Sequence, residues 1–180
     1  MESEIQWLLN IDDVNICKPI SENGEYVKKI NDCYCTMYKY IDGIADVEIE
    51  GNENLYIEIG RIAGLLHKNT IEKPFNAIRP KWSMENLIGK NGLWGDWRKT
   101  TVLNNQQKDI VEKTCTKIYE KVANYKTDKY GLIHIDLRLT NIIVGKTTGV
   151  IDFDDCGYGY FMQDLASSVS FLENSPQLST

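Results

Sequence analysis

The sequence predicts an α+β chain, with strands near its start and helices and loops after them. Short extended segments separated by turn residues occupy positions 14–41. Two stretches with apolar residues at helical spacing follow, and this order of elements is typical of α+β proteins. The 180 residues include 42% hydrophobic and 26% charged residues, which indicates a soluble globular protein long enough to bury a substantial core.

Composition and charge argue against several classes of function. Twenty Lys and Arg against 26 Asp and Glu give a net charge of −6 and a pI near 5.0, which opposes nucleic-acid binding. The apolar runs are shorter than the ~20 residues of a membrane helix, and the N-terminus carries acids where a secretory signal carries bases. Five cysteines without paired C-x-x-C units favour neither disulfides nor zinc. We expect a cytoplasmic protein with no nucleic-acid or membrane partner.

The N-terminal part is expected to contain a helix end and a β-hairpin. Residues 3–10 have apolar side chains on one helical side. Two extended pieces, residues 14–20 and 26–30, flank the dipeptide Asn23-Gly24. Asn-Gly between two such segments is a strong hairpin signal.

The remaining elements alternate between strands, helices and loops. Residues 33–41 are expected to form a strand, and residues 55–67 have the spacing of an amphipathic helix. Residues 73–101 are rich in Trp, Pro and Gly, so we expect an ordered but irregular insertion there. A second amphipathic helix is expected over residues 107–125, and short strands and loops from residue 131.

One stretch has the pattern that phosphoryl transfer requires. In His134-Ile-Asp-Leu-Arg-Leu-Thr-Asn141, Asp136 precedes Asn141 by five residues, and a predicted hairpin then ends in Asp152. This spacing should bring three oxygen-bearing side chains to one place. In phosphoryl transfer, one carboxylate accepts the proton of the substrate hydroxyl, while an Asn amide oxygen and a second carboxylate hold Mg²⁺ against the phosphates.

Each residue also has a simpler interpretation. His134 alone could be a core histidine bonded to a backbone carbonyl, and Asp152, Asp154 and Asp155 could form a solvated turn. Asp152, however, follows an apolar strand, where a buried carboxylate needs a partner. We interpret His67, at the end of a helix face, as a packing or helix-terminus residue rather than a metal ligand.

The motif resembles that of the aminoglycoside phosphotransferase and choline kinase family. Its members read H-G-D-x-x-x-x-N, then I-D-F or I-D-W, then D-L-A, and this chain has HIDLRLTN at 134–141 and VIDFDDCGYGYFMQDLA at 150–166. The resemblance implies a protein-kinase-like fold. Residues 1–42 would form a partial N-terminal lobe with a β-hairpin and a hinge strand, and residues 43–180 a mainly helical C-terminal lobe.

The resemblance also implies a role for each motif residue. Asp136 would be the catalytic base, and Asn141 and Asp152 the metal ligands. The other implied assignments are His134 as a residue that orders the loop, Asp164 as a structural acid, Asp154 and Arg138 as secondary site residues, Tyr40, Ile41 and Ile151 at the hinge and adenine pocket, and Glu4, with Glu2 as the less favoured alternative, as the acid that pairs with a lysine of the family.

The predicted function is therefore transfer of the γ-phosphoryl group of ATP or GTP, with Mg²⁺, to a small-molecule hydroxyl. Residues 1–42 leave no room for the family's Gly-rich loop and lysine, and family members continue past the D-L-A segment. We therefore expect a fragment with impaired activity that self-associates through exposed strand edges. One alternative is a non-catalytic kinase-like binding module. A Ser/Thr protein kinase is less favoured, since Ile135 stands where such kinases have Arg.

Overall fold

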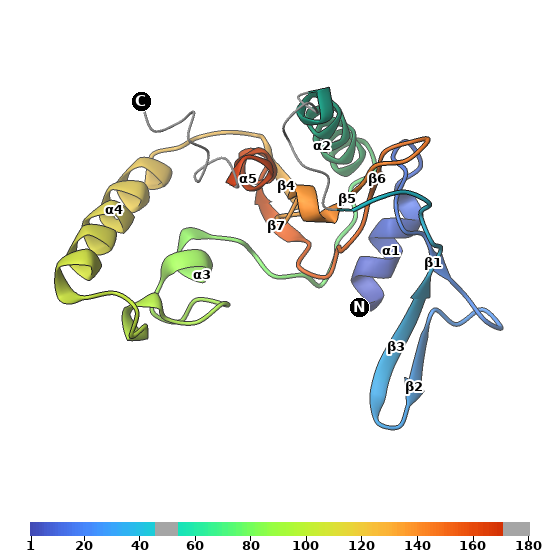
Figure 1. The fold of residues 1–180 in the computed structure, drawn as a ribbon, viewed down its shortest axis with the longest axis horizontal. Helices are drawn as coiled ribbons and strands as arrows, with labels where there is room; N and C mark the ends of the chain where they lie inside the picture. The colour runs from blue at the N-terminus through green and yellow to red at the C-terminus, as the bar shows by residue number, and fades with distance from the viewer. Residues whose placement is uncertain (46–53, 171–180) are drawn as a thin grey trace. The chain divides into compact units, whose positions relative to one another are not determined.

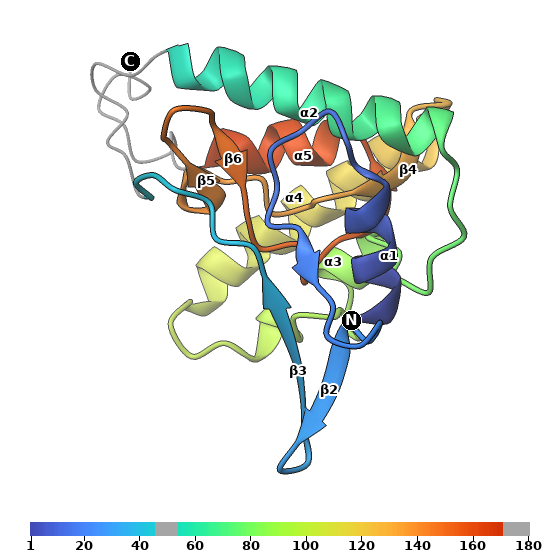
Figure 2. The ribbon, with the colours of Figure 1, turned by 90° about the vertical axis from the view of Figure 1, so that its right-hand side faces the viewer.

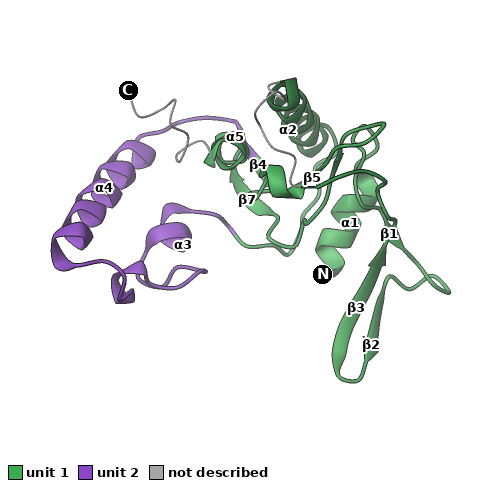
Figure 3. Cartoon of the chain, viewed as in Figure 1, with its two compact units in different colours: residues 1–80, 131–180 green, residues 81–130 purple. Residues whose placement is uncertain are grey.

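The computed structural model describes residues 1–45 and 54–170, and the chain divides into two compact units (Figure 3). Unit 1 contains residues 1–80 and 131–180, and unit 2 contains residues 81–130. The lobe boundary expected at residue 42 stays a prediction. Among the described residues, no helix combines the length and the apolar character needed to cross a bilayer.

Unit 1 begins with helix α1 (Glu2–Asn10), which places Trp7 and Leu8 in the core. The ammonium group of Lys18 contacts the C-terminal end of this helix. It donates hydrogen bonds to the carbonyl oxygen of Leu8, at 2.8 Å, and to that of Ile11. Lys18 therefore satisfies carbonyl groups that the helix end leaves without an internal partner.

Three strands follow α1 in unit 1 (Figure 1): β1 (Pro19–Ile20), β2 (Val27–Ile30) and β3 (Cys33–Tyr38). Strand β3 pairs antiparallel with both of the others. Strand β1 pairs with the end of β3, whereas β2 pairs with its beginning. The strand predicted over residues 33–41 therefore ends at Tyr38.

The β-hairpin forms at a different turn from the one predicted. Asn23 and Gly24 do make a turn, with φ values of 55° and 83°. Beyond a single bridge at this turn, however, the flanking strands pair with β3 instead of with each other. The hairpin joins β2 to β3 through Asn31 and Asp32, whose φ values of 48° and 65° suit a tight two-residue turn.

The rest of unit 1 carries the motif residues 134–166 on short strands and loops. Helix α2 (Asn54–Glu72) lies beside helix α5 (Met162–Ser168) (Figure 2). Helix α2 is longer than predicted, because no proline interrupts it before Pro74. The short elements between are β4 (Tyr130–Ile133), the 3-10 helix η2 (Leu139–Asn141), β5 (Ile142–Ile143), β6 (Gly149–Val150) and β7 (Gly157–Tyr160).

Strand pairing fixes the end of β6 relative to the N-terminal segment. Strand β6 pairs with β5, and β7 pairs with β4. The Val150 N–H also donates to the Asn15 carbonyl at 2.9 Å, and the Cys17 N–H donates to the Val150 carbonyl at 3.3 Å. The fully buried Val150 therefore holds the chain just before Asp152 against residues 15–17.

Unit 2 contains α3 (Met84–Ile88), the 3-10 helix η1 (Trp97–Lys99) and α4 (Asn105–Ala123). The short helix α3 corrects the expectation that residues 73–101 lack regular structure. The Ser83 side chain caps it, a local signal that the Gly-rich composition obscured. Helix α4 matches the predicted helix and starts with a reciprocal capping box between Asn104 and Gln107.

Candidate active site

The 134–141 loop fixes the carboxylate of Asp136 in one orientation. The Arg138 guanidinium contacts both carboxylate oxygens, with Nε 2.5 Å from Oδ1 and Nη2 2.7 Å from Oδ2. The Asn141 amide nitrogen donates to Asp136 Oδ2 at 2.9 Å and to its carbonyl oxygen at 2.8 Å. The Asp136 side chain remains 24% exposed, so it can still meet a substrate.

Asp164, at the start of α5, supports this loop through hydrogen bonds to its backbone. Its side chain is fully buried and accepts hydrogen bonds from the backbone N–H groups of Ile135, at 2.7 Å, and His134, at 3.4 Å. His67 Nε2 lies 2.8 Å from Asp164 Oδ2, and its ring stacks on Phe161. His67 therefore packs as predicted, but its contact with Asp164 could not be read from the sequence.

These bonds hold the backbone of Ile135 in an unusual conformation. Its φ is 67°, a left-handed value that β-branched residues rarely adopt and that costs of order 1–3 kcal/mol. Glycine adopts this conformation without such a cost. The geometry therefore gives a physical reason for the small residue at this position in the family motif.

His134 connects the 134–141 loop to the strand that leads to Asp152. The side chain is fully buried, and its Nε2 donates to the Ile151 carbonyl at 3.0 Å. Burial lowers the pKa of His134, which favours the neutral ring at neutral pH. Its ring lies 4.4 Å from that of Phe153, which in turn lies 5.7 Å from the Trp7 ring on α1.

Residues 152–156, called the acidic loop below, bring three carboxylates together. A hydrogen bond with Asp154, burial, and the negative charges of Asp154, Asp136 and Asp155 raise the pKa of Asp152 to about 6. Burial, followed by the charges of Asp154 and Asp136, also raises the pKa of Asp155. Asp136 and Asp152 are thus close enough to influence each other. A divalent cation would relieve this repulsion.

The donors present fit such a cation. The amide nitrogen of Asn141 donates both of its hydrogen bonds to Asp136. The amide oxygen of Asn141 therefore remains as the atom that can bind a metal. Across the described residues, no three His, Cys, Asp or Glu side chains form a complete metal cage. Mg²⁺ usually takes only one or two carboxylates and completes its shell with waters and phosphates.

A cavity of about 290 Å³ adjoins the acidic loop. It is lined by Glu4, Leu8, Cys17, Tyr38, Ile151, Asp152, Phe153 and Asp154. Glu4 is buried and accepts a hydrogen bond from the Tyr38 hydroxyl at 2.8 Å. Burial, together with this bond to Glu4, raises the pKa of Tyr38.

The cavity contains only part of the predicted nucleotide pocket. Ile151 lines it, whereas Tyr40 and Ile41 are absent from its lining, and Tyr40 is 85% exposed. Tyr38, the last residue of β3, lines the cavity, although no motif in the sequence pointed to it. The period-2 alternation of a strand could have indicated that Tyr38 and Tyr40 share one side, but not where the strand ends.

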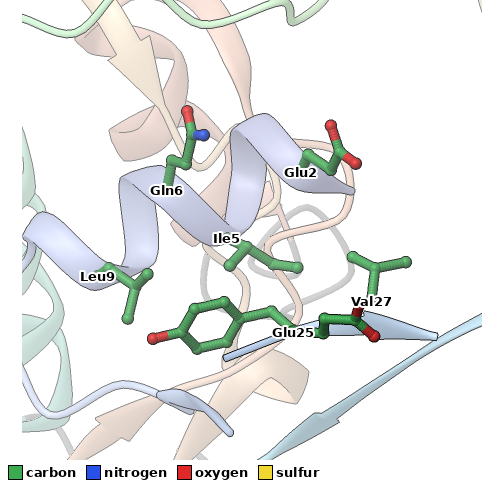
Figure 4. A pocket seen from close by; sticks show the side chains of 7 residues that line it. Glu2, Ile5, Gln6, Leu9, Glu25 and Val27 are labelled. Carbon is green, nitrogen blue, oxygen red and sulfur yellow. The ribbon is translucent and has the colours of Figure 1, made fainter. Parts of the chain in front are cut away.

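A larger hollow of about 550 Å³ lies away from this chemistry, between α1 and the start of β2 (Figure 4). It is lined by Glu2, Ile5, Gln6, Leu9, Glu25, Tyr26 and Val27. This lining contains two separate acids and an apolar floor, and none of the motif residues. The smaller cavity beside Asp152 is therefore the better candidate for a reaction site.

Comparison with known proteins assigns the sequence to one family. A profile described as the phosphotransferase enzyme family matches residues 1–178. The chain belongs to this phosphotransferase family. The protein-kinase-like fold is also confirmed, because the structure of a microcompartment-associated aminopropanol kinase superposes with a TM-score of 0.84. That match has 27% sequence identity and covers 98% of this chain and 60% of the kinase.

Two kinases are similar in sequence to this phosphotransferase-family chain. Amicoumacin kinase from Bacillus subtilis (strain 168) is 26% identical over 185 residues, which covers 92% of this chain and 51% of that kinase. Hydroxylysine kinase from Bos taurus is 28% identical over 153 residues, which covers 74% of this chain and 39% of that kinase. The chain thus spans about half or less of the length of these relatives.

Proposed function

We propose that this chain forms part of a kinase that transfers the γ-phosphoryl group of ATP or GTP to a hydroxyl group of a small molecule. The observation that carries the proposal is the fixed carboxylate of Asp136. Arg138 and Asn141 orient it, and its charge acts on Asp152 beside the cavity. A positioned carboxylate next to a cation site is what phosphoryl transfer needs.

Each motif residue then has a defined task. Asp136 accepts the proton of the acceptor hydroxyl, and its two partners keep the carboxylate aimed while it does so. Asn141 and Asp152 hold Mg²⁺, with Asp154 as a further candidate ligand. The bound cation supplies positive charge that neutralises the phosphates. His134 and Asp164 maintain the backbone of the loop, through the hydrogen bonds described above.

We propose an amino alcohol as the acceptor. Hydroxylysine kinase and the aminopropanol kinase are named for compounds that carry both an amine and a hydroxyl group. The net charge of −6 of this chain suits a cationic acceptor. We also propose a cytoplasmic location, since nucleoside triphosphates are available there and all five cysteines are free thiols.

The test is phosphate transfer by the Asp136→Asn variant. Radiolabelled ATP, Mg²⁺ and a panel of amino alcohols would be incubated with an excess of protein, so that a slow single turnover can be seen. We expect transfer to fall by about 10²–10⁴-fold, because the proton acceptor is lost. Nucleotide affinity should stay within about threefold, since Asp136 is not assigned to the nucleotide.

Asp109→Asn is the matched control, because it removes the same charge from an exposed position on α4. Transfer by Asp136→Asn at the level of this control would refute the role of Asp136. The second candidate function is a non-catalytic binding module, for which one observation speaks: the Glu4 carboxylate is already engaged, by the Tyr38 hydroxyl at 2.8 Å and by Arg79 at 3.9 Å. Metal-dependent ATP binding by the unaltered chain with no transfer to any acceptor would support that module.

A further inference from the structure

Arg79 touches both α1 and the acidic loop. Its side chain is only 10% exposed. Nε donates to the carbonyl oxygen of Cys156 at 2.5 Å, and Nη2 donates to that of Asp154. Nη1 lies 3.9 Å from Glu4 Oε2 on α1. One guanidinium therefore links the helix, the loop and the segment that follows α2.

The backbone around Arg79 is anchored as well. The carbonyl of the next residue, Pro80, accepts a hydrogen bond from the Tyr158 N–H at 2.8 Å. The residue next to Arg79 is thus anchored to β7, while the Arg79 side chain contacts the loop. A planar guanidinium can donate in several fixed directions at once, which a lysine ammonium cannot reproduce with the same geometry.

The loop that Arg79 holds is rich in negative charge. Asp152, Asp154 and Asp155 place three carboxylates within four residues of the chain, and like charges at such short spacing repel one another. Arg79 places a positive charge next to the loop and donates hydrogen bonds to the carbonyl groups of Asp154 and Cys156. It can therefore hold the backbone in place while the carboxylates point toward the cavity.

We propose that Arg79 is a positioning residue of the phosphotransfer site, which fixes the acidic loop so that the carboxylates of Asp152 and Asp154 converge on one cation, and which ties that loop to Glu4 of α1. This inference rests on the proposed function for its consequence, namely tight metal-dependent nucleotide binding. The positioning itself can be tested without any nucleotide.

The first measurement is hydrogen exchange of the backbone amides in residues 154–157, in the full chain without ligand. The Cys156 N–H donates to the Phe153 carbonyl at 3.0 Å, a bond that depends on the loop keeping its shape. We expect at least about tenfold faster exchange there in Arg79→Gln, with no change in α2. Arg61→Gln, which removes an exposed arginine paired with Glu58 on α2, is the matched control.

The second measurement is binding of the non-hydrolysable ATP analogue AMP-PNP by calorimetry, with Mg²⁺ and with EDTA. We expect Arg79→Gln to weaken the Mg²⁺-dependent affinity about 10- to 100-fold, the usual effect of losing a residue that orients metal ligands. The EDTA affinity should not change. Arg79→Lys should restore little of the lost Mg²⁺-dependent affinity, because lysine keeps the charge but not the planar guanidinium with its several fixed donors.

The outcomes separate the two ideas. Wild-type exchange rates in a folded Arg79→Gln would overturn the positioning role, and so would full recovery of Mg²⁺-dependent binding by Arg79→Lys. Unfolding of both variants would also overturn it, since the loss would then be one of global stability. If the wild-type chain binds no AMP-PNP, the proposed function fails, and the exchange experiment still decides the role of Arg79.

Discussion

Asp136 and Asp152 are both carboxylates that follow short strands, yet the chain surrounds them differently. Asp136 has an arginine and an amide donor on its oxygens. Asp152 shares a hydrogen bond with another acid and has a pKa raised to about 6. The chain itself therefore satisfies the first carboxylate, whereas no described residue forms an ion pair with the second of the kind that Arg138 forms with Asp136.

The difference shows how one site can prepare two groups for two tasks. A proton acceptor must keep its direction before the substrate arrives, so fixed donors from the protein are useful. A metal ligand must exchange its partners for a cation, and a permanent salt bridge would compete with that exchange. Removing a partner that supports Asp136 should accordingly lower the free energy of unfolding, whereas removing the charge of Asp152 should raise it.

The largest change in stability is expected at Asp164, which supports the backbone just before Asp136. Asp164→Asn should lower the free energy of unfolding by about 3 kcal/mol, because it leaves buried N–H groups and His67 without their charged acceptor. Urea denaturation followed by circular dichroism would measure it. Asp109→Asn should change stability by less than about 0.5 kcal/mol. A similarly small loss in Asp164→Asn would mean that the loop does not depend on this acid.

A smaller loss is expected beside Asp136. Arg138→Gln removes the charged fork and should cost about 1 kcal/mol, since the Arg138 side chain is 42% exposed and water screens part of the interaction. The same denaturation experiment applies. Repeating it at high salt should shrink the difference between variant and wild type. An Arg138→Gln protein as stable as wild type at low salt would show that the pair contributes nothing to the fold.

The smallest effect has the opposite sign. Without metal at neutral pH, Asp152→Asn should raise the free energy of unfolding, by no more than about 1 kcal/mol, because it removes a repulsion that water partly screens. Excess Mg²⁺ with AMP-PNP should make the wild type the more stable of the two proteins, since only the wild type offers the Asp152 carboxylate to the cation. Thermal unfolding with and without both additions would show the crossover. Destabilisation by Asp152→Asn in EDTA would contradict the comparison.

Much of the fold could be predicted from local sequence. Helical periodicity located α2 and α4, and the Asn23-Gly24 turn forms where it was expected. The motif placed Asp136 and Asn141 on one loop, where they are hydrogen-bonded. Their chemical roles stay predictions. The choice of strand partner was wrong for the hairpin, because two adjacent turns compete and only tertiary pairing decides between them.

The partners of the site residues could not be predicted in the same way. Tyr38 bonds to Glu4 across 34 positions, and His67 bonds to Asp164 across 97. Arg79 reaches the acidic loop from 75 positions away. Such contacts leave no periodic pattern, because each depends on how separate elements pack. A single sequence therefore indicates the reacting groups better than it indicates the groups that orient them.

The contact between Trp7 and Phe153 gives this protein a built-in optical reporter. The indole of Trp7 is 1% exposed and meets the Phe153 ring edge-on at 5.7 Å, and Phe153 sits between two acids of the loop. Any rearrangement that carries Phe153 away should admit water to the indole and shift its emission to longer wavelength. With the other three tryptophans replaced by phenylalanine, fluorescence could follow the loop in real time without a label.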